Sequence, residues 1–182
     1  MGSIKQLLPY KGCTLVEYAI QQAQASGFDP VVVVLGAQAE AVGGAVAHTS
    51  ALSVVNENWA SGMGSSITCG AAKILELRPD MDSLAVLLAD QPLVTAEHLK
   101  KMGRVFLMTN APIVAAAYAG TLGVPAFFRR SVFHQLQALK PEAGARALLR
   151  GGDAEVLVYD LPEAAIDVDT PEDFAAVKRL PA

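Results

Sequence analysis

The stretch SLAVLLADQPLVTAEHLKKMGRVF, residues 83–106, carries the pattern that decides the fold. Its apolar run 83–90 fits a strand that is buried on both faces of a sheet. Residues 95–106 follow as a predicted helix, and Thr95 is placed to cap its first turn. A buried strand that leads into a helix is the repeating unit of α/β proteins, so we place Asp90 in the connection between the two.

The same alternation extends in both directions from this unit. Two further runs have the composition of buried strands, 30–37 and 52–56, and three weaker strands are predicted at 111–118, 124–128 and 155–160. Helical spacing predicts helices at 14–26 and 170–180, the second with Pro171 at its first position. Strands that alternate with helices predict an α/β fold with a mostly parallel sheet.

The composition argues against several classes of protein. The 182 residues are enough for one domain with a sizeable core, and a hydrophobic content of 52% favours a packed chain over a disordered one. A net charge of -4 argues against a surface that coats nucleic acid. No apolar run is long enough to span a bilayer, so we expect no membrane partner and a cytoplasmic location. We interpret Cys13 and Cys69 as core thiols in a reducing compartment.

Acidic side chains stand where ligands bind in such sheets, at the carboxyl ends of the strands. Asp90 follows a predicted strand and either holds a metal ion or caps the next helix. The stretch IDVDTPED, residues 166–173, is the second acidic site. We place Asp167 and Asp169 on opposite sides of a strand, so that only one of them joins Asp90. Two such carboxylates suit Mg²⁺, although an acidic loop face also produces them without any metal.

The connection NENWASGMGSSITCG, residues 56–70, is a third candidate loop. Its small and hydroxyl-bearing residues have two possible roles. They let the backbone approach a flat ligand and offer it hydroxyls, or they form an ordinary glycine-rich turn into a helix. These residues are Gly62, Gly64, Ser65 and Ser66. We interpret Trp59 as a core residue rather than a stacking platform.

Four stretches, taken in order, resemble the MobA-like NTP transferases, which are molybdenum cofactor nucleotidyltransferases, and especially their cytidylyltransferase branch. They span almost the whole chain: MGSIKQLLPYKG (1–12), NENWASGMGSSI (56–67), LLADQPLVT (87–95) and IDVDTPEDF (166–174). The first is similar to the end of a glycine-rich signature. The others are similar to a Gly-Met-x-x-Ser-Ser loop, an Asp-Gln-Pro metal loop and a carboxyl-terminal Asp-x-Asp-Thr-Pro-Glu-Asp motif. Each motif is weak alone, and the ordered set is specific to the family.

The resemblance implies a three-layer α/β/α, Rossmann-like nucleotide-diphospho-sugar transferase fold. It implies transfer of a nucleoside monophosphate to molybdopterin with release of pyrophosphate, from CTP or alternatively from GTP. By the same resemblance Lys5, Asp90 and Asp169 are catalytic, and Asp90 and Asp169 hold Mg²⁺. The implied nucleotide-binding residues are Lys5, Gly62, Gly64, Ser65, Ser66 and Asp90. Arg146 is expected at the acceptor phosphate, because KPEAGAR (140–146) lacks the Lys of the family's Gly-Asp-Lys-Gly-Ala-Arg.

Two other functions stay open beside this one. The same motifs would serve a nucleotidyltransferase for another phosphate acceptor, such as a sugar phosphate. A different class is a non-catalytic protein that handles molybdopterin for a partner, either a molybdoenzyme or its maturation chaperone.

The beginning of the chain departs from the resemblance. In the family a first strand and a Leu-Ala-Ala-Gly loop precede the residues that Met1 and Gly2 match. We therefore expect residues 1–182 to form a single MobA-like nucleotidyltransferase domain, truncated at its N-terminus. In this family that strand is central, between 30–37 and 83–90, so we expect an opening or a rearranged edge between those two runs.

Overall fold

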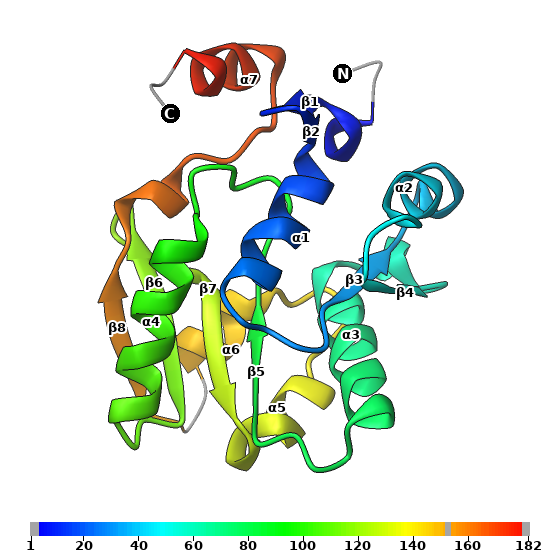
Figure 1. Cartoon of the computed structure of the whole chain (residues 1–182). Helices are drawn as coiled ribbons and strands as arrows, with labels where there is room; N and C mark the ends of the chain where they lie inside the picture. The colour runs from blue at the N-terminus through cyan, green and yellow to red at the C-terminus, as the bar shows by residue number, and fades with distance from the viewer. Residues whose placement is uncertain (1–3, 152–153, 180–182) are drawn as a thin grey trace.

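The computed structural model describes residues 4–151 and 154–179 (Figure 1). The strands are β1 (Pro9–Tyr10), β2 (Cys13–Thr14), β3 (Val32–Leu35), β4 (Leu52–Val55), β5 (Ser83–Val86), β6 (Ile113–Tyr118), β7 (Thr121–Arg129) and β8 (Val156–Asp160). The α-helices are α1 (Leu15–Ala25), α2 (Ala39–Val46), α3 (Met63–Leu77), α4 (Ala96–Met108), α5 (Phe133–Gln137), α6 (Ala145–Gly151) and α7 (Pro171–Lys178). Short 3₁₀ turns are η1 (Lys5–Leu7), η2 (Trp59–Ser61), η3 (Arg130–Val132) and η4 (Pro162–Ala165).

Threonine caps fix where three of the helices begin. The capping side chains accept the backbone amide three residues later at the starts of α1, α4 and α7, from Thr14, Thr95 and Thr170. In each case the third residue's side chain accepts the amide of the cap in return, which satisfies two helix-end donors at once. The predictions of Thr95 as a cap and of Pro171 in the first turn are confirmed.

The main sheet is mixed, so the expectation of a mostly parallel sheet was wrong. Its strand order is β5-β7-β6-β8; β7 runs antiparallel to both neighbours, and only β6 and β8 are parallel. The reason is a tight turn: Ala119 and Gly120, both with positive φ, join β6 directly to β7. Two strands joined by a two-residue turn pair antiparallel.

The strand β5 and the pair of β3 and β4 belong to two separate sheets. β3 pairs in parallel with β4, and within the described residues no backbone ladder joins this pair to β5. The side chains of Leu52 and Val55 are 43% and 48% exposed, so the prediction of a strand buried on both faces was wrong for β4. The run 30–37 and the run 83–90 therefore belong to separate sheets, whereas a missing strand between them stays a prediction.

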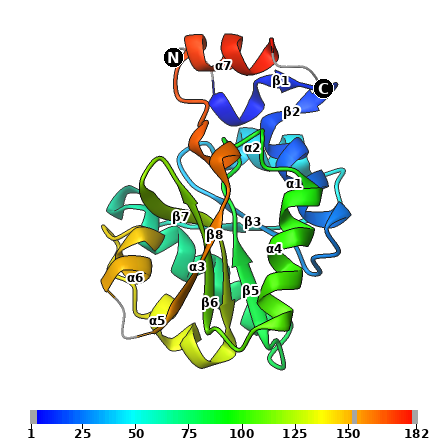
Figure 2. The same ribbon diagram turned by 90° about the vertical axis from the view of Figure 1, so that its left-hand side faces the viewer.

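Helices cover both faces of the main sheet, which Figures 1 and 2 show from two sides. On one face α4 places Leu99, Met102 and Phe106 against β6 and β7. On the other face α3, α5 and α6 pack against the same two strands, with Phe128 fully buried between them. The layered α/β/α arrangement follows from these two clusters.

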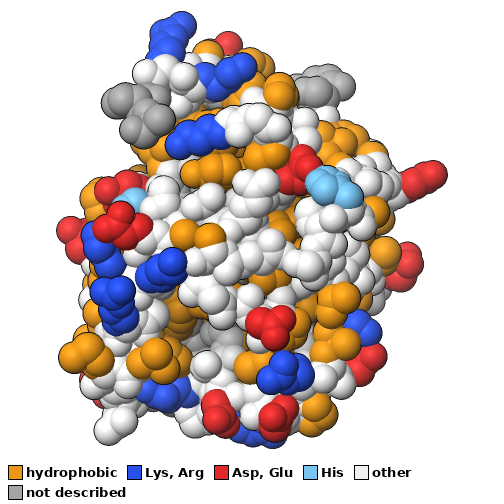
Figure 3. Space-filling model, in the orientation of Figure 1, with side chains coloured by type: hydrophobic (Ala, Val, Ile, Leu, Met, Phe, Trp, Pro, Cys, Tyr) orange, Lys and Arg blue, Asp and Glu red, His pale blue; other side chains and the backbone are white. Residues whose placement is uncertain are grey.

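The surface shows no separation of charge by sign on the face drawn in Figure 3, where acidic and basic side chains are interspersed. Of the described helices, none combines the length and the apolar character that crossing a membrane requires. Cys13 and Cys69 are free thiols and only partly buried, so their interpretation as core thiols was wrong.

Candidate active site

Three distant parts of the sequence meet at one ammonium group. The Nζ atom of Lys5, on η1, lies 2.7 Å from Oδ2 of Asp90 and 2.8 Å from Oδ1 of Asp169. Because both oxygens bond to one nitrogen, they are less than about 6 Å apart. The expected approach of Asp90 to Asp169 is therefore confirmed, while their role as metal ligands stays a prediction.

Local packing explains why Asp169 reaches Asp90. The amide of Val168 donates to the carbonyl of Asp90 at 2.9 Å. The Val168 side chain is fully buried beside Tyr10 and Leu15, which anchors the segment against the start of the chain. With Val168 pointing into this cluster, the carboxylate of the next residue is left on the solvent side, beside Lys5.

The capping box of α7 also holds Asp169. The carboxylate of Asp173 accepts the backbone amide of Thr170 at 2.8 Å and that of Asp169 at 3.3 Å. The hydrogen bond from the Thr170 hydroxyl, followed by that from its amide, lowers the pKa of Asp173. An ionised carboxylate at the amino end of a helix is also favoured by the helix dipole, so the backbone of Asp169 is well fixed.

The electrostatics favour a charged triad. Burial, the largest single effect, lowers the pKa of Lys5, but its hydrogen bonds to Asp169 and Asp90 together with their negative charges raise the pKa overall. The side chain of Asp90 is 20% exposed and that of Asp169 is 66% exposed. The second oxygen of Asp90, Oδ1, is buried and has no hydrogen-bond partner among the residues that the structure describes. Asp90 thus has an acceptor to spare for a further cation or donor.

Asp167 corrects one of our expectations. Residues 166–169 form no strand, and residues two apart on an extended chain share one side, so placing Asp167 opposite Asp169 was wrong. Burial raises the pKa of Asp167, and the charges of Asp90 and Asp169 raise it further. Gln91, which our site prediction missed, is buried and donates to the carbonyl of Ala164 at 2.8 Å. The sequence signal that could have identified Gln91 is its place directly after Asp90 in the Asp-Gln-Pro motif.

The donor set fits a divalent ion such as Mg²⁺. Carboxylate oxygens are its preferred protein ligands, one oxygen of Asp90 lacks a partner, and the Lys5 ammonium already occupies a cation position between Asp90 and Asp169. The described ranges contain no cluster of three or more His, Cys, Asp and Glu side chains that suits a metal. A two-carboxylate site matches an ion that keeps most of its waters.

The predicted glycine loop is in tight contact, but with the protein's own backbone. A Cβ atom on Gly64 would lie 2.1 Å from the carbonyl oxygen of Lys140, and one on Gly62 would lie 2.6 Å from that of Pro141. The amide of Gly64 donates to the same Pro141 oxygen at 2.9 Å. The two glycines therefore permit the segment 140–143 to pack on the start of α3.

The hydroxyls of the loop are organised by a residue that we did not single out. Asn56 is buried, and its Nδ2 donates to the hydroxyls of Ser65 and Ser66 at 2.8 and 3.0 Å. Ser65 donates in turn to the carbonyl of Gly62 at 2.8 Å. Beside this network is a hollow of about 630 Å³, lined by residues that include Asn56, Asn58, Ser65 and Cys69. Nucleotide-sized ligands occupy pockets of about 300–1,000 Å³.

The remaining predicted residues do not join the triad. Within the described residues no hydrogen bond or ion pair connects Gly62, Gly64, Ser65 or Ser66 to it. Arg146 is exposed on α6, and no contact between it and the triad is present in the described part of the chain. Trp59 is 48% exposed, so its interpretation as a core residue was wrong. Met1 and Gly2 lie outside the described residues.

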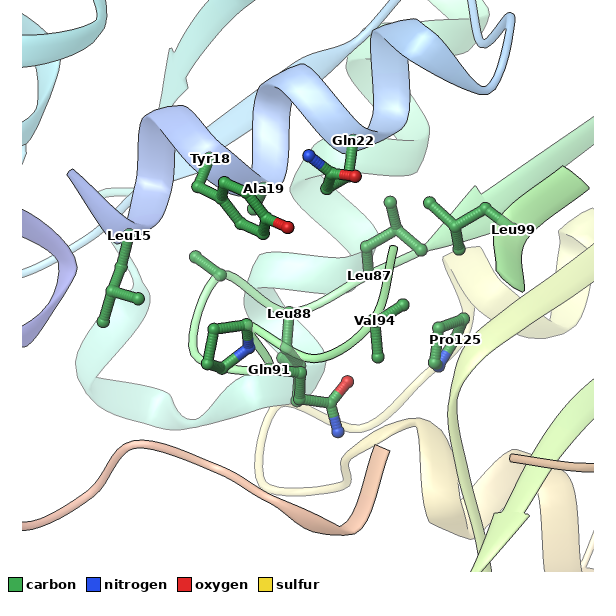
Figure 4. Close-up of a pocket in the computed structure, with 12 residues that line it drawn as sticks. Leu15, Tyr18, Ala19, Gln22, Leu87, Leu88, Gln91, Val94, Leu99 and Pro125 are labelled. Atoms are coloured by element: carbon green, nitrogen blue, oxygen red, sulfur yellow. The ribbon is translucent and has the colours of Figure 1, made fainter. Parts of the chain in front are cut away.

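A small cavity lies on the buried side of the Asp90 loop (Figure 4). Tyr18 and Gln22 of α1 face Leu87 and Gln91 of the segment after β5 across it. Its volume of about 20 Å³ is roughly that of one water, far below what a nucleotide needs. Of the two hollows, the larger one beside Asn56 is therefore the candidate nucleotide pocket.

Comparisons with known proteins agree on one family. The sequence model of the MobA-like NTP transferase domain matches residues 1–156. The chain is 34% identical over 179 residues to nicotine blue oxidoreductase of Paenarthrobacter nicotinovorans, covering 92% of this chain and 84% of that protein. It is 29% identical over 191 residues to the purine catabolism protein PucB of Bacillus subtilis, covering 98% and 90%.

Two solved structures are similar to almost the whole chain. Two crystal structures of Rv0371c from Mycobacterium tuberculosis H37Rv are each 29% identical to this chain. One superposes with a TM-score of 0.84 and covers 99% of this chain and 91% of that protein. The other, a complex with manganese, has a TM-score of 0.79 and covers 96% and 90%. With the family match over most of its length and a relative above 30% identity, the chain belongs to the MobA-like NTP transferase family.

Proposed function

We propose that the protein is a nucleotidyltransferase that moves a nucleoside monophosphate from a nucleoside triphosphate to a phosphate acceptor. The observation that carries this proposal is the meeting of Lys5, Asp90 and Asp169, at the place where an α/β sheet binds its ligands. An ammonium group and two oxygen ligands are what a triphosphate with its metal ion requires. Membership of the NTP transferase family supports the same reaction class.

The acceptor that we propose is molybdopterin, and the donor is CTP, with GTP as the alternative. Support comes from the similarity of the four ordered motifs to the cytidylyltransferase branch. Partners in this reading include a molybdoenzyme or its maturation chaperone, and the location is cytoplasmic.

The chemistry is an in-line displacement. A phosphate oxygen of the acceptor attacks the α-phosphorus and forms a new P–O bond. The bond from the α-phosphorus to its bridging oxygen breaks, and pyrophosphate leaves with the electron pair. The attacking oxygen is already ionised, so the protein's task is to position the reactants and neutralise charge.

Each side chain has a place in this scheme. Lys5 binds the triphosphate, and Arg146 the acceptor phosphate. Asp90 and Asp169 would hold Mg²⁺, which would neutralise the phosphate oxygens. The related Rv0371c is known as a manganese complex, which supports a divalent ion at such a site. The hollow beside Asn56 and Ser65 is the proposed base and ribose pocket.

The test is pyrophosphate release from CTP or GTP with molybdopterin and Mg²⁺. Asp90→Asn should abolish release while keeping the melting temperature, because Asp90 lies past the end of β5 rather than in a core cluster. Asp160→Asn is the matched control, since Asp160 is an exposed acid at the end of β8. Full release by a folded Asp90→Asn protein would refute the role of Asp90. Pyrophosphate release with a sugar phosphate and not with molybdopterin would show that the acceptor is a different phosphate compound.

A second candidate is a protein that binds molybdopterin without transferring a nucleotide. Two observations favour it: the names of the two relatives describe an oxidoreductase and a purine catabolism protein, and Gly62 and Gly64 are closed against the segment 140–143. Molybdopterin binding without any triphosphate binding or pyrophosphate release would decide for this candidate.

A further inference from the structure

The Lys5 ammonium lies between two carboxylates, a position that also suits a metal cation. The ammonium bonds to Asp90 and Asp169 at almost equal distances, 2.7 and 2.8 Å. Among the described residues it is the one basic side chain in ion-pair contact with either carboxylate. Two carboxylates that share such a small space repel each other unless a positive charge lies between them. The ammonium therefore keeps the pair together.

The ammonium and a metal ion compete for the same oxygens. A carboxylate oxygen that Lys5 occupies cannot also coordinate a divalent ion without displacing it. Displacement is feasible because the Lys5 side chain is 30% exposed and has a flexible four-carbon stem. The backbone need not follow, because Ile4 and Leu7 pack against the cluster formed by α1, β3 and α2.

We propose that Lys5 holds Asp90 and Asp169 together before a divalent ion binds, and that it moves to the triphosphate when this ion takes its place. This proposal rests on the proposed function, since it assumes that the two carboxylates receive a metal ion and that a triphosphate binds beside them. It adds that two cations use the site in turn, the Lys5 ammonium that contacts both carboxylates and the divalent ion.

Coupling between the two ligands follows from this exchange. A metal ion that binds alone leaves the ammonium without a partner, so it binds weakly. A triphosphate supplies new anionic partners for Lys5, so the metal ion then binds more tightly. By linkage the metal ion strengthens triphosphate binding by the same factor, and such couplings are typically about 5–150-fold.

The first experiment measures Mn²⁺ binding in the absence of nucleotide, from the electron paramagnetic resonance signal of the free ion. Lys5→Met removes the competing charge, and we expect it to tighten Mn²⁺ binding by at least about fivefold. Lys11→Met is the matched control, because the Lys11 ammonium lies over the rings of Tyr10 and Tyr18 and not on the carboxylates. It should leave the affinity unchanged.

The second experiment repeats the titration with saturating CTP, after subtraction of the Mn²⁺ that CTP binds by itself. The wild-type protein should bind Mn²⁺ at least about fivefold more tightly with CTP, and Lys5→Met should lose this gain. Thermal melting adds a second readout: Lys5→Met should melt below wild type without metal, and Mn²⁺ should raise its melting temperature more than that of wild type.

The outcomes separate the alternatives. If Lys5 only holds the ligands in place, Lys5→Met binds Mn²⁺ more weakly, and the exchange is refuted. Unchanged affinity refutes it as well, as does the absence of Mn²⁺ binding by both proteins. If the coupling is present but no pyrophosphate is released with any acceptor, the proposed function fails while the exchange stands.

Discussion

Gly64→Ala is the sharpest test of how the candidate nucleotide loop is built. The added methyl group would lie 2.1 Å from the carbonyl oxygen of Lys140 and 2.4 Å from that of Ala143, both of them backbone atoms. Overpacking of this kind costs about 1–3 kcal/mol, and loss of the Gly64 to Pro141 hydrogen bond costs about 1 kcal/mol more. The better helix propensity of Ala returns about 1 kcal/mol. Because the last two terms cancel, we expect a net loss of about 1–3 kcal/mol.

Urea unfolding measures this loss, and the melting temperature should fall by about 2–12 °C for a chain of this size. Gly44→Ala is the matched control, because Gly44 lies within α2 and no atom is within 4 Å of an added Cβ. That change should stabilise the protein by about 0.5–1 kcal/mol through helix propensity. A Gly64→Ala protein as stable as wild type would show that the segment 140–143 does not rest on the glycine.

Two other changes test the helix caps. Thr95→Ala removes the side chain that caps α4 and should cost about 1 kcal/mol in urea unfolding at pH 7; no loss would mean that the cap does not contribute. Glu17 accepts hydrogen bonds from the hydroxyl and the amide of Thr14, and these bonds lower the pKa of Glu17 from 4.5. The ionised carboxylate therefore stabilises the fold fully above pH 4.5. This stabilisation is lost as the pH falls through the lowered pKa. Glu17→Gln should therefore be less stable than wild type at pH 7, and the two urea midpoints should converge as the pH falls through the lowered pKa of Glu17; a constant difference would contradict the sign.

Local signals in the sequence predicted the elements well. Apolar runs bounded by turn residues marked β5, β6 and β8, while Thr95 marked the start of α4 and Pro171 that of α7. The approach of Asp90 to Asp169 was predictable because Asp90 follows a predicted strand, at the edge where such sheets bind ligands, and because the family resemblance placed both residues in one site.

Long-range pairing was not predictable in the same way. The apolar run 124–128 has the composition of a parallel strand, and only the turn at Ala119 and Gly120 makes β7 antiparallel. Gly62 and Gly64 mark close approach, but a glycine does not say whether a ligand or the chain's own backbone comes near. For Asp167 the failure was ours, since the two-residue spacing from Asp169 already placed both on one side.

Within the described residues no backbone ladder joins β3 to β5, so the molecule has two separately hydrogen-bonded frames. One is the sheet of β3 and β4, and the other is the sheet of β5, β7, β6 and β8. The loop with Asn56 and Ser65 extends from the frame of β3 and β4, whereas Asp90 extends from the frame of β5. Between the frames, alignment depends on side-chain packing by α1 and α3, which yields more readily than a ladder of backbone bonds. A ligand that touches both frames would act as a brace between them. The free energy needed to order the two frames would lower the apparent affinity for this ligand.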